Sequence, residues 1–145
     1  LTLKESDGLG VGVIGDGDCM GGVIAFWPEA RDTLPVLFIV AIIRGYYNDG
    51  LHHEGVATHR GREPENRWVR QTVDHPAPNI SQIADGLGVK AAGPIDSIKE
   101  LEAALARGIE VVRGGKPFLV DVHIDPGYGR ELTESSAERS FGKTK

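Results

Sequence analysis

An uninterrupted apolar run at residues 35–43 limits the choice of fold more than any other feature of the chain. The run is short, rich in β-branched residues, and carries no polar side chain at alternate positions. A strand with one solvated face alternates apolar and polar residues, so this run predicts a strand that is buried on both faces. Such strands belong mainly to parallel sheets that helices cover on both sides. We therefore expect an α/β protein.

The remaining segments supply the other elements of such a fold. Short strands are predicted at residues 9–14, 89–92 and 117–124, and helices at residues 21–32, 78–87 and 97–112. Pro28 would kink the first of these helices. The last helix begins with a capping-box pattern, Ser97 and Glu100. Its spacing predicts one buried face, made of Ile98, Leu101, Ala104, Leu105, Ile109 and Val112.

The central part of the chain is harder to assign. Residues 44–78 are polar and show little periodicity. A structureless loop of that length is unusual inside a compact domain, so we expect short helix near residues 56–59. The order of elements predicts one α/β domain at residues 1–125, with a mostly parallel sheet and helices on both faces. A polar C-terminal tail is expected at residues 126–145.

Composition argues against several classes of function. The formal net charge is -5, and the basic residues are scattered or interleaved with Glu63 and Glu65, which disfavours a nucleic-acid partner. No apolar stretch approaches the ~18 residues of a membrane span. The single cysteine, Cys19, can form no internal disulfide, which fits a reducing compartment. We expect a cytoplasmic protein that binds neither nucleic acid nor membranes.

The sequence Gly15-Asp16-Gly17 follows the first predicted strand and is the strongest candidate for a functional site. Ligands of open α/β sheets bind outside the carboxyl ends of the strands, where glycines let the backbone approach phosphate oxygens. Asp16 would repel a bare diphosphate, so a carboxylate here requires a divalent cation, for which magnesium is the usual choice. The alternative interpretation is a plain Asp-Gly turn.

Three other patterns have weaker support. The glycines at 10, 12 and 15 match the dinucleotide-binding pattern, but the predicted strand runs through them rather than before them. His53 and His59 stand six apart instead of the four that a zinc protease helix requires, so the histidines are interpreted as surface loop residues. Cys19 has the position of a reactive thiol near a helix start, but packing at a tight turn is the preferred interpretation.

Several segments together resemble a known family. These are Gly15-Asp16-Gly17-Asp18, Ala25-Phe26-Trp27, the apolar residues 34–41, and Tyr46-Tyr47-Asn48-Asp49. They look like the diphosphate-binding domain of thiamine diphosphate enzymes, in the branch of acetolactate synthase, benzoylformate decarboxylase and related 2-oxo acid decarboxylases and carboligases. The resemblance covers residues 9–125. It implies a lyase or transferase that uses thiamine diphosphate and magnesium.

The resemblance also implies roles for individual residues. Asp16 would bind magnesium, and the backbone carbonyl of Gly45 would be a second ligand. The glycine turn, Gly15 and Gly17, and the backbone amides of Asp18 and Cys19 would hold the diphosphate. Asn48 is a candidate to replace a missing ligand. Asp49 is a candidate for proton handling, although a solvated loop carboxylate is the preferred interpretation for it.

The chain departs from the family pattern in two ways. The family has Asn-Asn some two dozen residues after Gly-Asp-Gly, whereas this chain has Ile42-Ile43 at that spacing, and Ile43 offers no atom to a metal. The family's domain also begins with a further strand and helix, whereas this chain has only fourteen residues before Gly15. The separate pyrimidine-binding domain, whose glutamate activates the cofactor, would have to act in trans. No catalytic residue is assigned.

Four hypotheses follow from the sequence. The first is a thiamine diphosphate- and magnesium-binding domain of a 2-oxo acid decarboxylase or carboligase, not catalytic alone and in a homo-oligomer. The second is a non-catalytic homologue or assembly partner that has lost the metal ligand. The third is a general nucleotide or phosphate binder. The fourth is a misassignment at residues 42 and 43, because the codons of Asn and Ile differ by one base.

Overall fold

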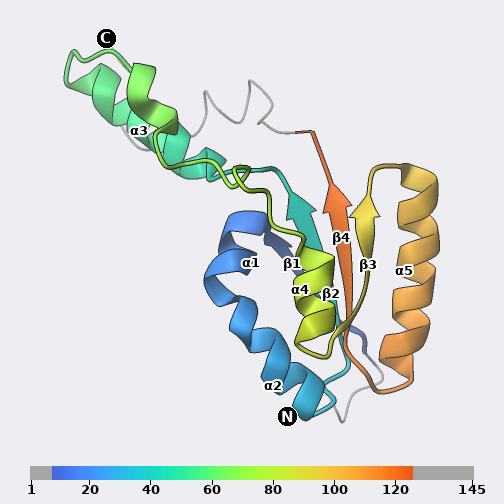
Figure 1. Cartoon of the computed structure of the whole chain (residues 1–145). Helices are drawn as coiled ribbons and strands as arrows, with labels where there is room; N and C mark the ends of the chain where they lie inside the picture. Colours follow the sequence, from blue (N-terminus) through green and yellow to red (C-terminus); the bar gives the residue numbers. More distant parts are fainter. Residues whose placement is uncertain (1–7, 126–145) are drawn as a thin grey trace. The chain divides into compact units, whose positions relative to one another are not determined.

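The computed structural model describes residues 8–125 of the chain, which fold around a four-stranded parallel sheet. Its strands are β1 (Gly10–Gly15), β2 (Val36–Ile42), β3 (Lys90–Ile95) and β4 (Phe118–His123). They lie side by side in the order β1-β2-β4-β3 (Figure 1). All three pairings are parallel, so every strand has its carboxyl end at the same edge of the sheet. The predicted α/β architecture is confirmed; the tail expected at residues 126–145 lies outside the described residues.

The chain divides into two compact units. The first, which we call the sheet unit, comprises the described residues 8–43 and 78–124 and contains all four strands. The second, the helical unit, comprises residues 44–77. It holds helix α3 (Tyr47–His59) and the 3₁₀ turn η3 (Glu65–Trp68).

The connection from β1 to β2 is helical but starts earlier than predicted. Helix α1 (Asp16–Gly22) begins directly after β1, a 3₁₀ turn occupies Val23–Ala25, and helix α2 (Phe26–Arg31) follows. The expected single helix at residues 21–32 is therefore divided, and the division precedes Pro28. Pro28 lies in the first turn of α2, where backbone N–H groups have no partner within the helix, so its missing N–H disrupts no bond there.

Helices α4 (Ile80–Gly86) and α5 (Ile98–Arg113) both have a side-chain N-cap, and the cap of α5 agrees with the predicted pattern. Asn79 caps α4 by accepting a hydrogen bond from the Gln82 N–H at 2.9 Å. At α5, Ser97 Oγ accepts from the Glu100 N–H at 3.3 Å and donates to Glu100 Oε2 at 2.7 Å. One detail was wrong: Ile98, predicted on the buried face, is 77% exposed. It lies one turn before Leu101, where α5 first packs against the sheet.

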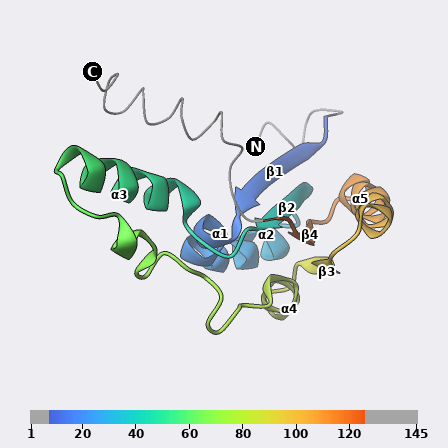
Figure 2. The same ribbon diagram turned by 90° about the horizontal axis from the view of Figure 1, so that it is seen from above.

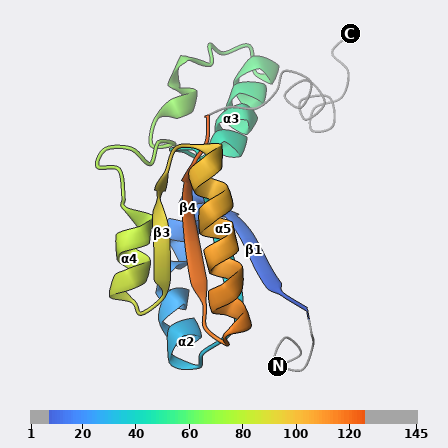
Figure 3. The same ribbon diagram turned by 90° about the vertical axis from the view of Figure 1, so that its right-hand side faces the viewer.

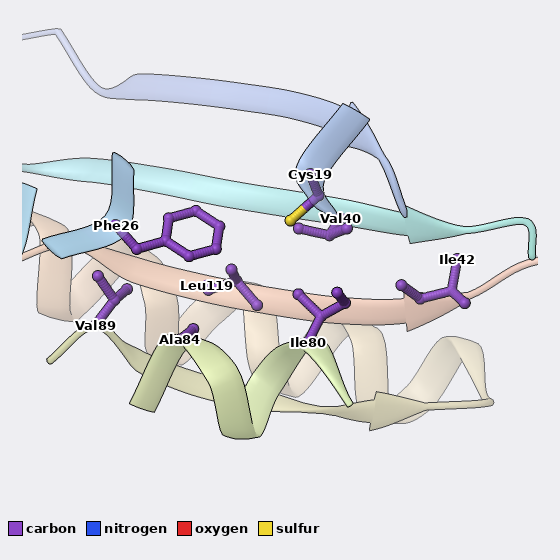
Figure 4. Packing of buried hydrophobic residues seen from close by; sticks show 8 residues of the cluster. All are labelled: Cys19, Phe26, Val40, Ile42, Ile80, Ala84, Val89 and Leu119. Atoms are coloured by element: carbon purple, nitrogen blue, oxygen red, sulfur yellow. The ribbon is translucent and has the colours of Figure 1, made fainter. Parts of the chain in front are cut away.

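The helices cover the two faces of the sheet with separate hydrophobic clusters. Figure 2 shows α4 and α5 on opposite sides of β3 and β4, and Figure 3 shows α5 lying over β4. Gly108 allows this close approach, because a Cβ there would lie 2.7 Å from the Leu37 side chain and 2.9 Å from Phe118. On the opposite face, the cluster consists of Cys19, Phe26, Val40, Ile42, Ile80, Ala84, Val89 and Leu119 (Figure 4).

The helical unit contains far more helix than its sequence pattern predicts. Helix α3 extends well beyond the expected residues 56–59. Trp68 of η3 packs on its first turns, with ring centroids 4.9 Å apart at Tyr47 and with Gly50 directly beneath the indole. A Cβ at Gly50 would lie 3.0 Å from that ring. The Trp68 contact involves only the first turns of α3 and requires no apolar stripe along the helix, which explains why periodicity missed it.

Over the described residues 8–125, no helix is both long and apolar enough to cross a membrane.

Candidate functional site

The Gly15-Asp16-Gly17 turn lies at the carboxyl edge of the sheet, as predicted. Gly15 is the last residue of β1 and the N-cap of α1, with an extended backbone at φ -77 and ψ 160. Gly15 pairs in register with Ala41 of β2. The residues that follow this pair in the chain are Asp16, which begins α1, and Ile42, which ends β2. This is the edge at which open α/β sheets bind their ligands.

Asp16 is the first residue of α1 and is buried, with 1% of its surface exposed. Its Oδ1 accepts a hydrogen bond from the Gly17 N–H at 3.0 Å. A carboxylate in the first turn of a helix is stabilised by the helix dipole, and Asp18, which is exposed, shares this turn. Burying an ionised carboxylate is costly unless a counter-charge or further hydrogen bonds compensate. The arrangement suits a divalent cation that would join Asp16 to an anionic ligand.

Cys19 lies one turn further along α1 and is also buried, with 2% exposed. Burial raises the pKa of its thiol to about 11, and the negative charges of Asp121 and Asp16 act in the same direction. Because the thiolate is the reactive form, this thiol is protonated and inert at neutral pH. The packing interpretation is therefore favoured over the reactive one. The dinucleotide pattern is disfavoured as well, since its glycines lie within β1 and not after it.

At its carboxyl end β2 has isoleucine side chains, whereas β1 is followed by the carboxylate of Asp16. Ile42 ends the strand and is 8% exposed, in the cluster with Cys19 and Val40 (Figure 4). Ile43 follows it and is half-buried. The carbonyl oxygen of Ile42 accepts a hydrogen bond from the Ile124 N–H at 3.2 Å. Neither side chain offers an oxygen or nitrogen to a metal, so the departure from the family pattern persists in the fold.

Two of the other candidate residues, Gly45 and Asn48, belong to the helical unit. Gly45 is buried in an antiparallel bridge with Thr72, and a Cβ on it would lie 2.8 Å from the Gln71 carbonyl oxygen. Only glycine fits that position without displacing the backbone. Asn48 and Asp49 are exposed in the first turn of α3.

Sequence reasoning missed a second buried carboxylate, Asp121 on β4. It is 2% exposed and pairs in register with Val40, on the face that carries Cys19. Its Oδ2 accepts a hydrogen bond from the Ser81 N–H at 3.1 Å, whereas Oδ1 has no hydrogen-bonding partner within residues 8–125. Burial raises the pKa of this carboxyl group. The sequence does contain a signal for it, because Asp121 is the one charged residue in the apolar segment 118–122.

The histidines occupy a helix rather than the expected loop. His52, His53 and His59 all lie on α3 and are exposed. Across the residues that the structure describes, no group of three or more His, Cys, Asp or Glu side chains is placed to hold a metal. Any cation at the Gly-Asp-Gly turn would therefore need Asp16 together with backbone, ligand or water oxygens.

Comparison with known proteins decides the family. The family described as "Thiamine pyrophosphate enzyme, C-terminal TPP binding domain" matches residues 3–122. The chain belongs to this family. It is a thiamine diphosphate-binding domain of the kind found in enzymes such as decarboxylases, and the resemblance noted in the sequence is confirmed. A comparison with curated proteins gave no match.

Solved structures share the fold. A Rhodococcus jostii RHA1 thiamine diphosphate-dependent 4-hydroxybenzoylformate decarboxylase aligns with TM-score 0.58 and 20% identity, over 85% of this chain and 20% of that one. A putative thiamin diphosphate-dependent enzyme from Mycobacterium smegmatis aligns with TM-score 0.57 and 25% identity, over 86% and 19%. Benzoylformate decarboxylase from Polynucleobacter necessarius aligns with TM-score 0.61 and 14% identity, over 87% and 22%. The chain thus spans about a fifth of the length of these proteins.

Proposed function

We propose that the chain binds the diphosphate of thiamine diphosphate through a magnesium ion on Asp16, as the cofactor-binding part of an acetolactate synthase-like 2-oxo acid decarboxylase or carboligase. The observation that carries this proposal is the buried Asp16, which lies between two glycines at the start of α1. The α1 amides at Asp18 and Cys19 would face the diphosphate oxygens. The bound cofactor would supply the carbon nucleophile, and the chain's own residues would hold and orient it.

The residues present fit the diphosphate better than they fit the metal. Glycine at positions 15 and 17 lets a ligand approach the backbone, and the Asp16 carboxylate is a hard oxygen donor of the kind that magnesium prefers. The carboxyl end of β2 contributes only Ile42 and Ile43 side chains. The roles that the family resemblance assigns to the Gly45 carbonyl and to Asn48 stay predictions. We therefore expect a magnesium site with fewer protein ligands and weaker binding than the family pattern implies.

Calorimetry on two matched variants tests the role of Asp16. Asp16→Asn removes a buried carboxylate, whereas Asp18→Asn removes an exposed one two residues away in the same turn. We expect Asp16→Asn to weaken thiamine diphosphate binding in magnesium by at least about tenfold, and Asp18→Asn to change it by less than about threefold. Equal losses in the two variants would overturn the assignment of the metal to Asp16.

A second candidate function has one observation in its favour. Ile43, at the position of the missing metal ligand, is a half-buried hydrocarbon side chain next to the core residue Ile42, as expected of a homologue that has kept the fold and lost the ligand. Such a protein would act as a non-catalytic assembly partner. Retention of the Gly15-Asp16-Gly17 turn favours the first function. Absence of thiamine diphosphate binding at millimolar concentration, with the fold intact by circular dichroism, would establish the second function instead.

Partners are proposed from the exposed edge of the sheet. β1 is an edge strand, and its Val11 and Val13 side chains are 51% and 69% exposed. An uncharged edge with exposed valines favours contact with further protein. We propose that a pyrimidine-binding domain acts in trans and that the chain self-associates. Sedimentation velocity checks the second part, since a monomer at every concentration from about 1 to 100 μM would overturn it.

A further inference from the structure

A surface cavity of about 380 Å³ lies on helix α3, within the helical unit, and the thiamine diphosphate proposal does not use it. It is lined by His52, His53, Val56, Ala57, Arg60 and Arg62. Four of these six side chains, those of the two histidines and the two arginines, carry N–H groups. The arginines are positively charged, and the histidines can become so. Val56 and Ala57, both half-buried, form the apolar part of the lining. A cavity with this lining suits a small ligand that has one anionic end and one apolar end.

The turn that ends α3 brings Arg62 back to the helix. Gly61 has φ +64, the left-handed conformation that glycine adopts most readily. The Arg62 N–H donates to the Ala57 carbonyl oxygen at 2.9 Å, and the Gly61 N–H donates to the Thr58 carbonyl oxygen at 3.0 Å. This is the hydrogen-bond pattern of a Schellman motif. Arg60 and Arg62, on either side of Gly61, both line the cavity.

The two arginines are not needed to cap the helix. Backbone N–H groups already bond the last-turn carbonyl oxygens of Val56, Ala57 and Thr58. The acidic residue Glu54 of α3 forms an ion pair with Arg67 of η3 at 3.0 Å. In contrast, neither Arg60 nor Arg62 forms an ion pair among the described residues. Two guanidinium groups thus stand at one cavity without an acidic partner.

We propose that this cavity binds the phosphate group of a small phosphate monoester with an apolar substituent. A phosphate monoester carries a charge of about -1.5 to -2 at neutral pH, which matches two guanidinium groups. Guanidinium forks bind phosphate oxygens in a bidentate manner, and the imidazole of His53 adds a further N–H donor. The apolar substituent would contact Val56 and Ala57.

Nuclear magnetic resonance titration of the full chain tests the proposal with phenyl phosphate, inorganic phosphate and benzoate as probes. Amide shifts at residues 52–62 report this cavity, whereas shifts at residues 15–19 report the Gly-Asp-Gly turn. Phenyl phosphate is expected to shift the α3 amides and to bind more tightly than either of the other probes. In the Asp16→Asn variant the α3 shifts should persist, so a failure here is distinguishable from a failure of the thiamine diphosphate proposal.

Two charge variants complete the experiment. The double variant Arg60→Gln/Arg62→Gln should weaken phenyl phosphate binding by at least about tenfold, because it removes two charge-assisted contacts. Arg113→Gln removes an exposed arginine from the last turn of α5 and should leave the affinity unchanged. Equal affinity for benzoate or inorganic phosphate would overturn the ligand class. Diffuse shifts without α3 preference, or an equal loss in Arg113→Gln, would overturn the site.

Discussion

The carboxyl ends of β1 and β2 are neighbours in the sheet but carry opposite chemistry. β1 leads into the buried carboxylate of Asp16, and β2 ends in the buried hydrocarbon of Ile42. Burial of a carboxylate has to be compensated by hydrogen bonds or by charge, whereas burial of the Ile42 side chain stabilises the folded chain by itself. The same edge of one sheet can therefore place a buried carboxylate after one strand and end the neighbouring strand in core packing. Variants at the two ends test this contrast directly.

The largest effect is expected from Ile42→Asn. This change puts an amide into the cluster that contains Cys19 and Val40, so it removes apolar burial and leaves polar atoms without partners. The free energy of unfolding should fall by about 3 kcal/mol in urea denaturation. Ile43→Asn, at the adjacent half-buried position, should cost about 1 kcal/mol. Equal costs at the two positions would contradict the assignment of Ile42 to the core.

Thiol labelling of Cys19 gives the next largest effect. Its pKa is raised from 9.0 to about 11, so near pH 8 its thiolate population is about a hundredfold below that of an ordinary cysteine. Labelling with a disulfide reagent should be slower by at least this factor in the native chain than in urea. Ile42→Ala, which opens the same cluster, should accelerate labelling. Rapid labelling of the native wild-type chain would show that Cys19 is not packed as described.

A moderate effect is expected from Ile43→Asn on cofactor binding. The new amide oxygen would lie at the end of β2, beside the strand that leads into Asp16. Affinity for thiamine diphosphate in magnesium should rise by at least about tenfold. The same variant in EDTA is the control and should show no gain. An unchanged affinity in magnesium would mean that the β2 end takes no part in the site.

The smallest effect concerns the buried carboxyl group of Asp121. Burial raises its pKa above the ordinary value of 3.8, so the folded state holds the proton more tightly than the unfolded chain does. Its contribution to stability is then fully present below that value and is lost as the pH rises through the folded pKa. Asp121→Asn keeps an acceptor for the Ser81 N–H and cannot ionise. The wild-type stability should fall relative to this variant as the pH rises, and a parallel pH profile would contradict the raised pKa.

The sequence predicted the sheet unit well because its signals are local. The apolar run of β2, the Ser97 cap of α5 and the glycine turn after β1 each determine structure within a few residues. The helical unit was underestimated because α3 depends on Trp68, which lies beyond its end in the sequence. A contact of this kind leaves no periodic pattern.

The candidate site was predicted unevenly for the same reason. Asp16 was found because a carboxylate between glycines after a strand has a chemical meaning within one turn. Asp121 was missed because its importance depends on a partner forty residues away, the Ser81 N–H. The cavity on α3 was missed because it needs the left-handed Gly61 to fold Arg62 back.

The most direct measurement is calorimetry of the wild-type chain with thiamine diphosphate, in magnesium and in EDTA. If the Asp16 turn holds the diphosphate through a cation, binding should be measurable at millimolar concentration or below in magnesium and should disappear in EDTA. Binding of equal strength in EDTA, or no binding in magnesium, would contradict the magnesium-dependent site at the end of β1.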